Sequence, residues 1–147
     1  MHWNRVKQYL KADPSDLIEV HFYDLDRQSW QSLFAWIQEK TVLLDCQFGR
    51  LNADELSLED FLAGKMSYIA HIKTQDGDEL SLSIIEEDEL TIDIEVGELD
   101  SEDKLERFLN KVVHIADIIG CNHYIICPEF ETEKAFIVNG QLSDISV

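Results

Sequence analysis

The chain has 147 residues, of which 45% are hydrophobic and 10% aromatic, enough for one folded domain and too many for a disordered segment. Twelve basic residues against thirty acidic ones give a formal net charge of −18. This charge disfavours nucleic acid and anionic membranes as partners, because Lys and Arg supply the affinity for phosphates; it favours either a cationic partner or simple solubility.

The N-terminal segment predicts a helix, a strand and a second helix. Trp3, Val6 and Leu10 share a helical face, and Pro14 ends that first helix. Residues 17–23 alternate between apolar and polar side chains, as a half-buried strand does. The next helix is capped by Asp26, and its apolar stripe is Trp30, Leu33, Phe34 and Ile37.

A second alternating strand and a short helix follow. Val42, Leu44, Cys46 and Phe48 predict one apolar face of a strand over residues 42–48. The stretch SLEDF at residues 57–61 has the spacing of a capping box, and Gly64 is placed to close the short helix that it starts.

Three strands are predicted next, over residues 66–74, 80–85 and 90–96. Asp76-Gly77 separates the first two and indicates a two-residue hairpin turn. If the apolar residues of the second and third strands share one face, the loop between them has an odd number of residues. The acidic residues of the third strand then point away from that face.

The C-terminal part predicts the longest helix and two further strands. Residues 101–119 form a helix with the stripe Leu105, Phe108, Leu109, Val112, Ala116 and Ile119. Gly120 stops it, and the apolar run at residues 123–127 predicts a strand buried on both faces. Residues 135–138 form the last strand, before a type I′ turn at Asn139-Gly140.

These elements predict one α+β domain spanning residues 1–147. We expect a mixed, mainly antiparallel sheet with helices packed on it. The helix 101–119 crosses between the strand at Leu90 and the strand at His123, and such a crossover is right-handed when the two strands are parallel.

The most informative stretch for function is acidic. From Asp76 to Asp103, thirteen of twenty-eight residues are Asp or Glu and none is Lys or Arg. Like charges on neighbouring strand positions repel, so solvent, distant bases, a metal or a partner must relieve them. Either the segment is a solvated face that guards a sheet edge, or it binds a cationic partner.

We therefore predict a partner-binding surface made of these acids and one aromatic residue. Its centre is the loop Glu86–Glu89, because a hairpin loop can enter a concave active site. Trp36 lies beside its helix stripe, where it either anchors an Arg-rich partner or packs on the edge of the core. The predicted contact residues are Asp76, Asp78, Glu79, Glu86, Glu87, Asp88, Glu89, Asp93, Glu95, Glu98 and Trp36.

Signals for metals and enzymatic chemistry are weak. Cys121, His123 and Cys127 lack zinc-finger spacing, which favours buried thiols and a hydrogen-bonded histidine. The acids at residues 76–79 lack the ligand spacing of a calcium loop. No glycine-rich phosphate loop, GxSxG or HExxH is present. We expect no catalytic residue, no metal site and no cofactor, and hence not an enzyme.

The cellular setting follows from the N-terminus and the cysteines. The sequence begins MHWNR, without a charged segment that leads into an apolar run, and no apolar stretch reaches membrane-spanning length. Three cysteines, an odd number among apolar neighbours, fit reduced thiols. We expect a cytoplasmic protein.

The stretch ADIIGCNHYIICPEFETEKAFIVNG, residues 116–140, resembles the end of several small bacterial immunity proteins. These neutralise the toxin domains of contact-dependent growth inhibition and polymorphic toxin systems. The resemblance implies an α+β cytosolic inhibitor of one cognate toxin, often a basic nuclease, and transfers no individual contact residue.

Together with the net charge, this resemblance predicts a non-enzymatic acidic immunity protein that occludes the active site of a basic toxin protein. The alternative is an acidic regulatory or adaptor module that acts through protein–protein contacts and self-associates as a homo-oligomer through a sheet edge.

Overall fold

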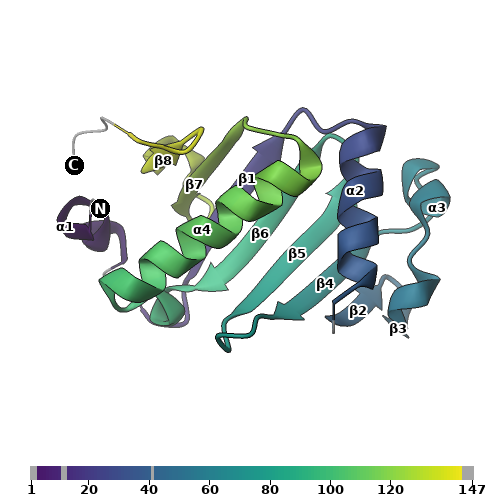
Figure 1. Ribbon diagram of the computed structural model, residues 1–147, viewed down its shortest axis with the longest axis horizontal. Helices are drawn as coiled ribbons and strands as arrows, with labels where there is room; N and C mark the ends of the chain where they lie inside the picture. Colours follow the sequence, from purple (N-terminus) through teal and green to yellow (C-terminus); the bar gives the residue numbers. More distant parts are fainter. Residues whose placement is uncertain (1–2, 11–12, 41, 144–147) are drawn as a thin grey trace.

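The computed structural model describes residues 3–10, 13–40 and 42–143, which form one sheet with helices on one of its faces (Figure 1). The helices are α1 (Trp3–Val6), α2 (Arg27–Gln38), α3 (Leu58–Leu62) and α4 (Glu102–Ile119), with the 3₁₀ turns η1 (Lys7–Leu10), η2 (Ala53–Glu55), η3 (Val96–Leu99) and η4 (Thr132–Lys134). The strands are β1 (Leu17–Tyr23), β2 (Val42–Cys46), β3 (Gly49–Leu51), β4 (Tyr68–Lys73), β5 (Glu79–Glu86), β6 (Glu89–Glu95), β7 (Tyr124–Pro128), β8 (Ile137–Val138) and β9 (Gln141–Leu142).

The sheet has the order β3-β2-β4-β5-β6-β1-β7-β8-β9, and each of these neighbouring pairs is antiparallel. The α+β prediction is confirmed. Strands β6 and β7 both run antiparallel to β1, which lies between them, so they are parallel to each other. Helix α4 makes the connection between them.

The core lies between the sheet and the helices α2 and α4, which cover the same face (Figure 1). The alternation in the central strands is the reason: every second side chain points toward the helices and is buried, including Ile18, Val20, Phe22, Leu82, Ile84, Leu90, Ile92 and Ile94. Full burial of one such side chain stabilises the fold by about 1.5–3 kcal/mol. On α4, Ile115 belongs to the buried stripe and Leu109 is only partly buried.

The predicted start of α2 at Asp26 and the predicted stop of α4 at Gly120 are confirmed. The side chain of Asp26 accepts from the Ser29 amide at 2.9 Å, and Ser101 accepts from the Lys104 amide at 3.2 Å. Gly120 ends α4 in the left-handed conformation, with φ of 65°.

The hairpin turns set which side chains share a face. The β4–β5 turn is one residue longer than predicted: the Thr74 amide donates to the Asp78 carbonyl, and the Gly77 amide donates back to Thr74. A β-bulge between Ser83 and Glu86 lets both strands of the β5–β6 hairpin bury their apolar residues on one side.

Several predicted strand limits are wrong, including that of the strand predicted over residues 66–74, which is Tyr68–Lys73. Strand β2 ends at Cys46, because residues 47 and 48 turn the chain so that β3 pairs with β2, and Phe48 is 82% exposed. Strand β7 begins after His123, and its Ile125 is only partly buried, since helices cover one face of the sheet. Only Ile137–Val138 of the last predicted strand pairs with a neighbour.

None of the helices in the described part of the chain is long and apolar enough to cross a membrane.

Candidate functional site

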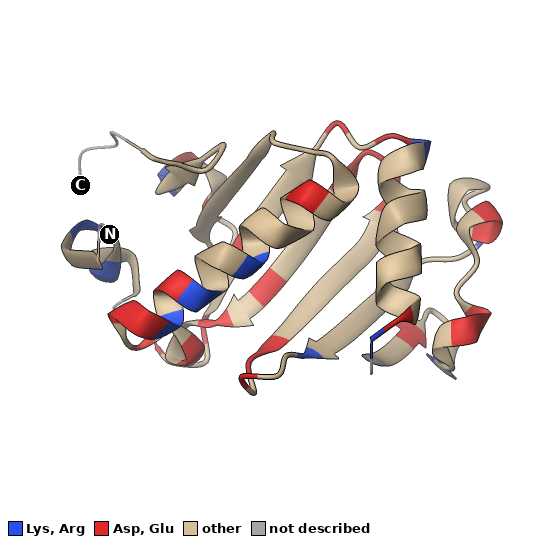
Figure 2. Ribbon diagram, in the orientation of Figure 1, with Lys and Arg blue, Asp and Glu red and all other residues tan. Residues whose placement is uncertain are grey.

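The residues predicted to bind a partner lie in separate places rather than in one patch. Figure 2 shows acidic residues at both ends of β5 and β6. These strands have eight and seven residues, so their two ends are about 20 Å apart at the usual rise of a strand. Acidic residues that are close together in the sequence therefore lie at opposite ends of two strands.

One group is an acidic tip at the β5–β6 turn, made of Glu86, Glu87 and Asp88 together with Asp24 and Asp26 of the β1–α2 loop. All five residues are exposed, whereas Glu89, the last residue of the predicted contact loop, is partly buried and bonds His21 at 2.7 Å. The two loops are joined by a hydrogen bond from the amide of residue 25 to the Asp88 carbonyl, at 3.2 Å.

The tip is held firmly, but its charge is not neutralised. The Trp30 indole of α2 donates to the Glu87 carbonyl and fixes the β5–β6 loop to the helix. No Lys or Arg within the described residues pairs with Glu86, Glu87 or Asp88. The neighbouring Arg27 pairs instead with Glu59. Glu86, Glu87 and Asp88 therefore present unpaired carboxylates on a fixed backbone, whereas Asp24 bonds His123 at 2.6 Å.

A second group lies at the opposite end of these strands. Glu79, Asp93, Glu95 and Glu98 line a small cavity of about 190 Å³. Their like charges make this cavity negative. They are too far from the acidic tip to contact the same small region of a partner.

The remaining two acids of the β4–β5 turn are already compensated. Lys111 of α4 donates to Asp78 at 2.8 Å and to Asp76 at 3.2 Å, and Arg107 lies within 4.0 Å of both. Asp78 is only 5% exposed. Distant bases relieve this part of the acidic segment, and Asp78 contributes to the internal structure rather than to an open surface.

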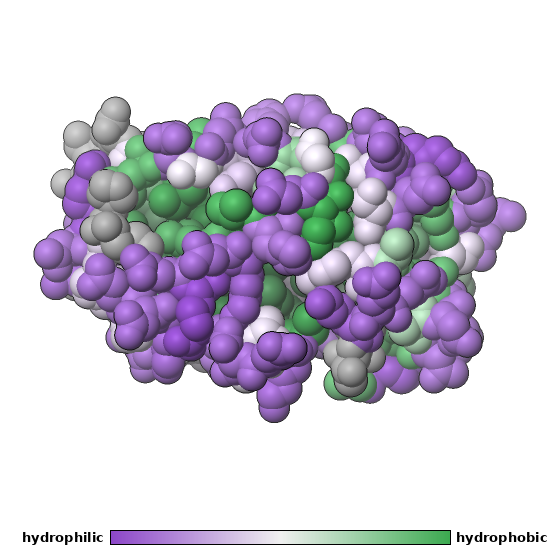
Figure 3. All heavy atoms as spheres, in the orientation of Figure 1, coloured by the Kyte–Doolittle hydropathy of each residue, from purple (hydrophilic) through white to green (hydrophobic). Residues whose placement is uncertain are grey.

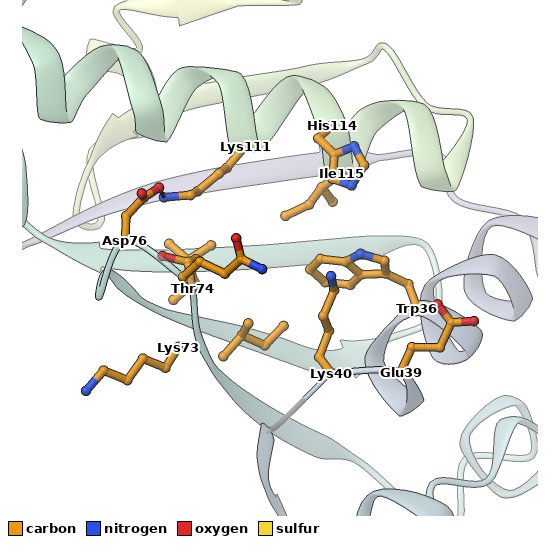
Figure 4. A pocket seen from close by; sticks show the side chains of 12 residues that line it. Trp36, Glu39, Lys40, Lys73, Thr74, Asp76, Lys111, His114 and Ile115 are labelled. Carbon is orange, nitrogen blue, oxygen red and sulfur yellow. Dashed lines mark hydrogen bonds and ion pairs between the residues drawn. The ribbon is translucent and has the colours of Figure 1, made fainter.

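Trp36 and Asp76 line a groove between α2 and α4, with a volume of about 480 Å³ (Figure 4). Apolar residues are visible between the two helices in the space-filling view, with hydrophilic residues around them (Figure 3). The Lys40 ammonium lies 5.4 Å from the centre of the indole ring, and the His114 ring is 6.4 Å away, edge-on. The indole already contacts residues of its own chain, and partner contact by Trp36 stays a prediction.

A different cluster lies on the helix-free face, the face of the sheet opposite α2 and α4. Glu19 and His21 of β1 and Cys127 of β7 each place one ligand-type atom within 4.8 Å of the others. Asp93 of β6 is the direct cross-strand neighbour of Glu19. The Phe130 amide donates to Glu19 at 2.9 Å, so the segment after β7 is attached to this cluster.

Burial and repulsion act on the acidic groups of this cluster. Burial, and then the charges of Glu19 and Glu129, raise the pKa of Asp93 to about 6. Burial, and then Glu19, raise the pKa of the Cys127 thiol to about 12. Both shifts disfavour the negatively charged forms of Asp93 and Cys127. A positive ion in this cluster would therefore be favoured.

The three residues considered for zinc from the sequence do not meet as a group. The Cys121 thiol donates to the Tyr23 carbonyl at 3.2 Å, and His123 is exposed and bonds Asp24 at 2.6 Å. Sequence reasoning missed Glu19 and His21, because an alternating strand is explained well enough by its buried face. The available signal was a Glu and a His on the other face of that strand.

Comparisons with known proteins identify the fold. A scan of the sequence against protein-family models finds no match, and a search of curated proteins finds none either. A search of solved structures matches one chain of the 1.75 Å crystal structure of the toxic C-terminal tip of CdiA from Pseudomonas aeruginosa in complex with immune protein. The match has a TM-score of 0.59 and 15% identity, over 89% of this chain and 99% of that one. The fold of this chain is therefore shared with one chain of that complex.

Proposed function

We propose that this protein is an immunity protein that binds and neutralises the toxin domain of a contact-dependent growth inhibition system. The observation that carries the proposal is the shared fold, which extends over nearly the whole of both chains. It agrees with the resemblance of residues 116–140 to small bacterial immunity proteins, which is a feature of sequence.

The charge favours the immune role over the toxic role. A toxin that acts on nucleic acid needs basic residues to hold phosphates, and a net charge of −18 opposes that contact. The same charge favours association with a basic toxin, because opposite charges accelerate the encounter and suppress wrong partners. We infer that the cognate toxin is basic and is a nuclease.

The proposed mechanism is occlusion of the toxin's active site by the acidic tip, without catalysis. Glu86, Glu87 and Asp88 are exposed and lack basic partners of their own, so pairing with toxin Lys and Arg breaks no ion pair within the described chain. These carboxylates would occupy the positions that hold substrate phosphates. The inhibitor would act in the cytoplasm of the cell that makes it.

The test is a charge reversal at the tip, with a matched control. The triple variant Glu86→Lys, Glu87→Lys and Asp88→Lys should weaken toxin binding at least about tenfold, since close interfacial charge pairs contribute about 1.5–7 kcal/mol. The control reverses Asp54, Glu106 and Glu133, three exposed acids on other elements, and changes the net charge equally. The toxin tested is any toxin domain found encoded in the adjacent gene; binding is measured by calorimetry, and protection by co-expression in bacterial cells.

The outcomes separate the functions. Loss of protection by the tip variant alone supports occlusion by the tip. Equal effects of both variants would show that only net charge matters and would remove the tip from the mechanism. Growth inhibition by this chain expressed alone would assign it the toxic role. An adaptor function is indicated if the wild type neither binds nor protects.

A further inference from the structure

We propose that Glu19, His21 and Cys127 bind one zinc ion on the helix-free face of the sheet, with water as the fourth ligand and Asp93 as a neighbouring carboxylate. This site is independent of the proposed toxin contact, because it lies on β1, β6 and β7 and not at the acidic tip.

The backbone brings the four side chains together through the register of three strands. Glu19 is paired with Asp93 on one side and with Cys127 on the other. His21 is two residues further along β1 and therefore on the same face. A row of Asp, Glu and Cys with a His beside it results from strand pairing between three distant parts of the sequence.

The distances suit a small cation after a slight contraction. Three atoms within 4.8 Å of one another share a centre no more than about 2.8 Å from each, against about 2.0–2.3 Å for ligands of zinc. The His21 Nε2 and Glu19 Oε1 atoms are already 3.5 Å apart. Side-chain movements of about half an ångström would bring these three atoms to zinc-binding distance.

The histidine is oriented as a ligand. Its Nδ1 lies 2.7 Å from Glu89 Oε1, and because a carboxylate only accepts, Nδ1 carries the proton. In the neutral ring the lone pair is on Nε2, which is buried, lies 3.5 Å from Glu19 Oε1 and has no hydrogen-bond partner among residues 3–10, 13–40 and 42–143. A carboxylate behind the distal nitrogen is the usual support of a metal-binding histidine.

A second buried atom in the cluster lacks a partner. Oδ1 of Asp93 is buried and accepts no hydrogen bond from the described residues. An unsatisfied buried carboxylate oxygen is destabilising, and a cation bound beside it would reduce that cost. Two orphaned polar atoms beside a buried thiol are difficult to explain as packing alone.

The ligand set selects zinc over magnesium or calcium. A thiolate and an imidazole are soft or borderline ligands, whereas magnesium and calcium take only oxygen. On binding, Cys127 releases its thiol proton to solvent and coordinates as thiolate. The ion would tie β7, and through the Phe130–Glu19 hydrogen bond the segment after it, to the centre of the sheet.

The test uses the full chain, stripped of metal with a chelator and without an affinity tag. Zinc titration by calorimetry should give one equivalent bound. Cobalt, used as a spectroscopic probe, should give a thiolate-to-metal charge-transfer band and intense tetrahedral visible bands. Cys127→Ser should remove the charge-transfer band, and Cys121→Ser, a second buried thiol, should keep it.

Two further variants cover the case in which Cys127→Ser does not fold. His21→Gln should weaken zinc binding more than the supporting variant Glu89→Gln, for which we expect a loss of about 10–100-fold. His71→Gln, on the same face of β4, is the matched histidine control and should bind as the wild type does. Less than one equivalent of zinc, a cobalt spectrum without a thiolate band, or equal losses in His21→Gln and His71→Gln would overturn the proposal.

Discussion

At the scale of single residues, the same type of side chain has different roles according to burial. Asp76 and Asp78 share the Lys111 ammonium, yet the Asp78 side chain is 6% exposed and the Asp76 side chain 49%. Water screens the more exposed pair, whereas the buried carboxylate has lost its hydration and depends on the lysine. The sequence does not distinguish these two residues, whereas the structure shows that only the Asp78 side chain is buried.

This difference predicts unequal costs of the same substitution. Asp78→Asn should lower the free energy of unfolding by about 1–3 kcal/mol, because it leaves a partly buried lysine without its main charge partner. Asp76→Asn is the matched control and should cost less than about 1 kcal/mol. Urea unfolding followed by circular dichroism measures both. Equal midpoints for the two variants would show that Asp78 is not a structural residue.

At the scale of elements, helix α4 connects two strands that are not neighbours and covers the core, so its length must be fixed. Ser101 begins it and Gly120 ends it. The C-terminal stop depends on backbone conformation alone: a Cβ at Gly120 would meet no other atom within 4 Å, but φ is 65°. A side chain at this position would have enough space, but its backbone would be strained in the left-handed region.

Gly120→Ala should therefore lower stability by about 1–2 kcal/mol through backbone strain. Gly120→Asn should cost less, because asparagine adopts the left-handed conformation more readily. In urea, the midpoint should fall while the slope with denaturant stays constant, since the surface exposed on unfolding is unchanged. An alanine variant as stable as the wild type would contradict a conformational origin.

At the scale of the whole molecule, the sheet ends in two short strands. The edges are β3, with three residues, and β9, with two. Short edge strands offer few free backbone groups for pairing with a second copy, and a net charge of −18 adds repulsion between copies. Both features oppose self-association through a sheet edge.

We predict that the protein alone is a monomer of 17.0 kDa at all salt concentrations used. Sedimentation velocity at low and high ionic strength measures this, because salt would screen the repulsion and reveal any attraction between edges. A dimer that forms as the salt concentration rises would support the alternative function, a self-associating adaptor module. Monomers throughout would leave binding to a different protein as the mode of action.

The sequence alone determined the local structure. Helix caps, the alternation of β1 and the stripe of α4 depend on neighbours within a few residues, so Asp26 and Gly120 were identified correctly and the start of α4 was placed within one residue. Strand ends such as Phe48 were not, because pairing with another strand decides where a strand stops. The fold class and the resemblance to immunity proteins also came from the sequence.

Only the tertiary structure decided which side chains meet. The acids of the segment 76–103 are continuous in sequence, but an extended strand carries its two ends apart, and the distant Lys111 neutralises part of them. Conversely, Glu19, His21 and Cys127 come together solely because β1 pairs with β7 in one register. Charge and periodicity are properties of a chain, whereas a site is a property of strands brought side by side, and their register depends on the packing of the whole sheet.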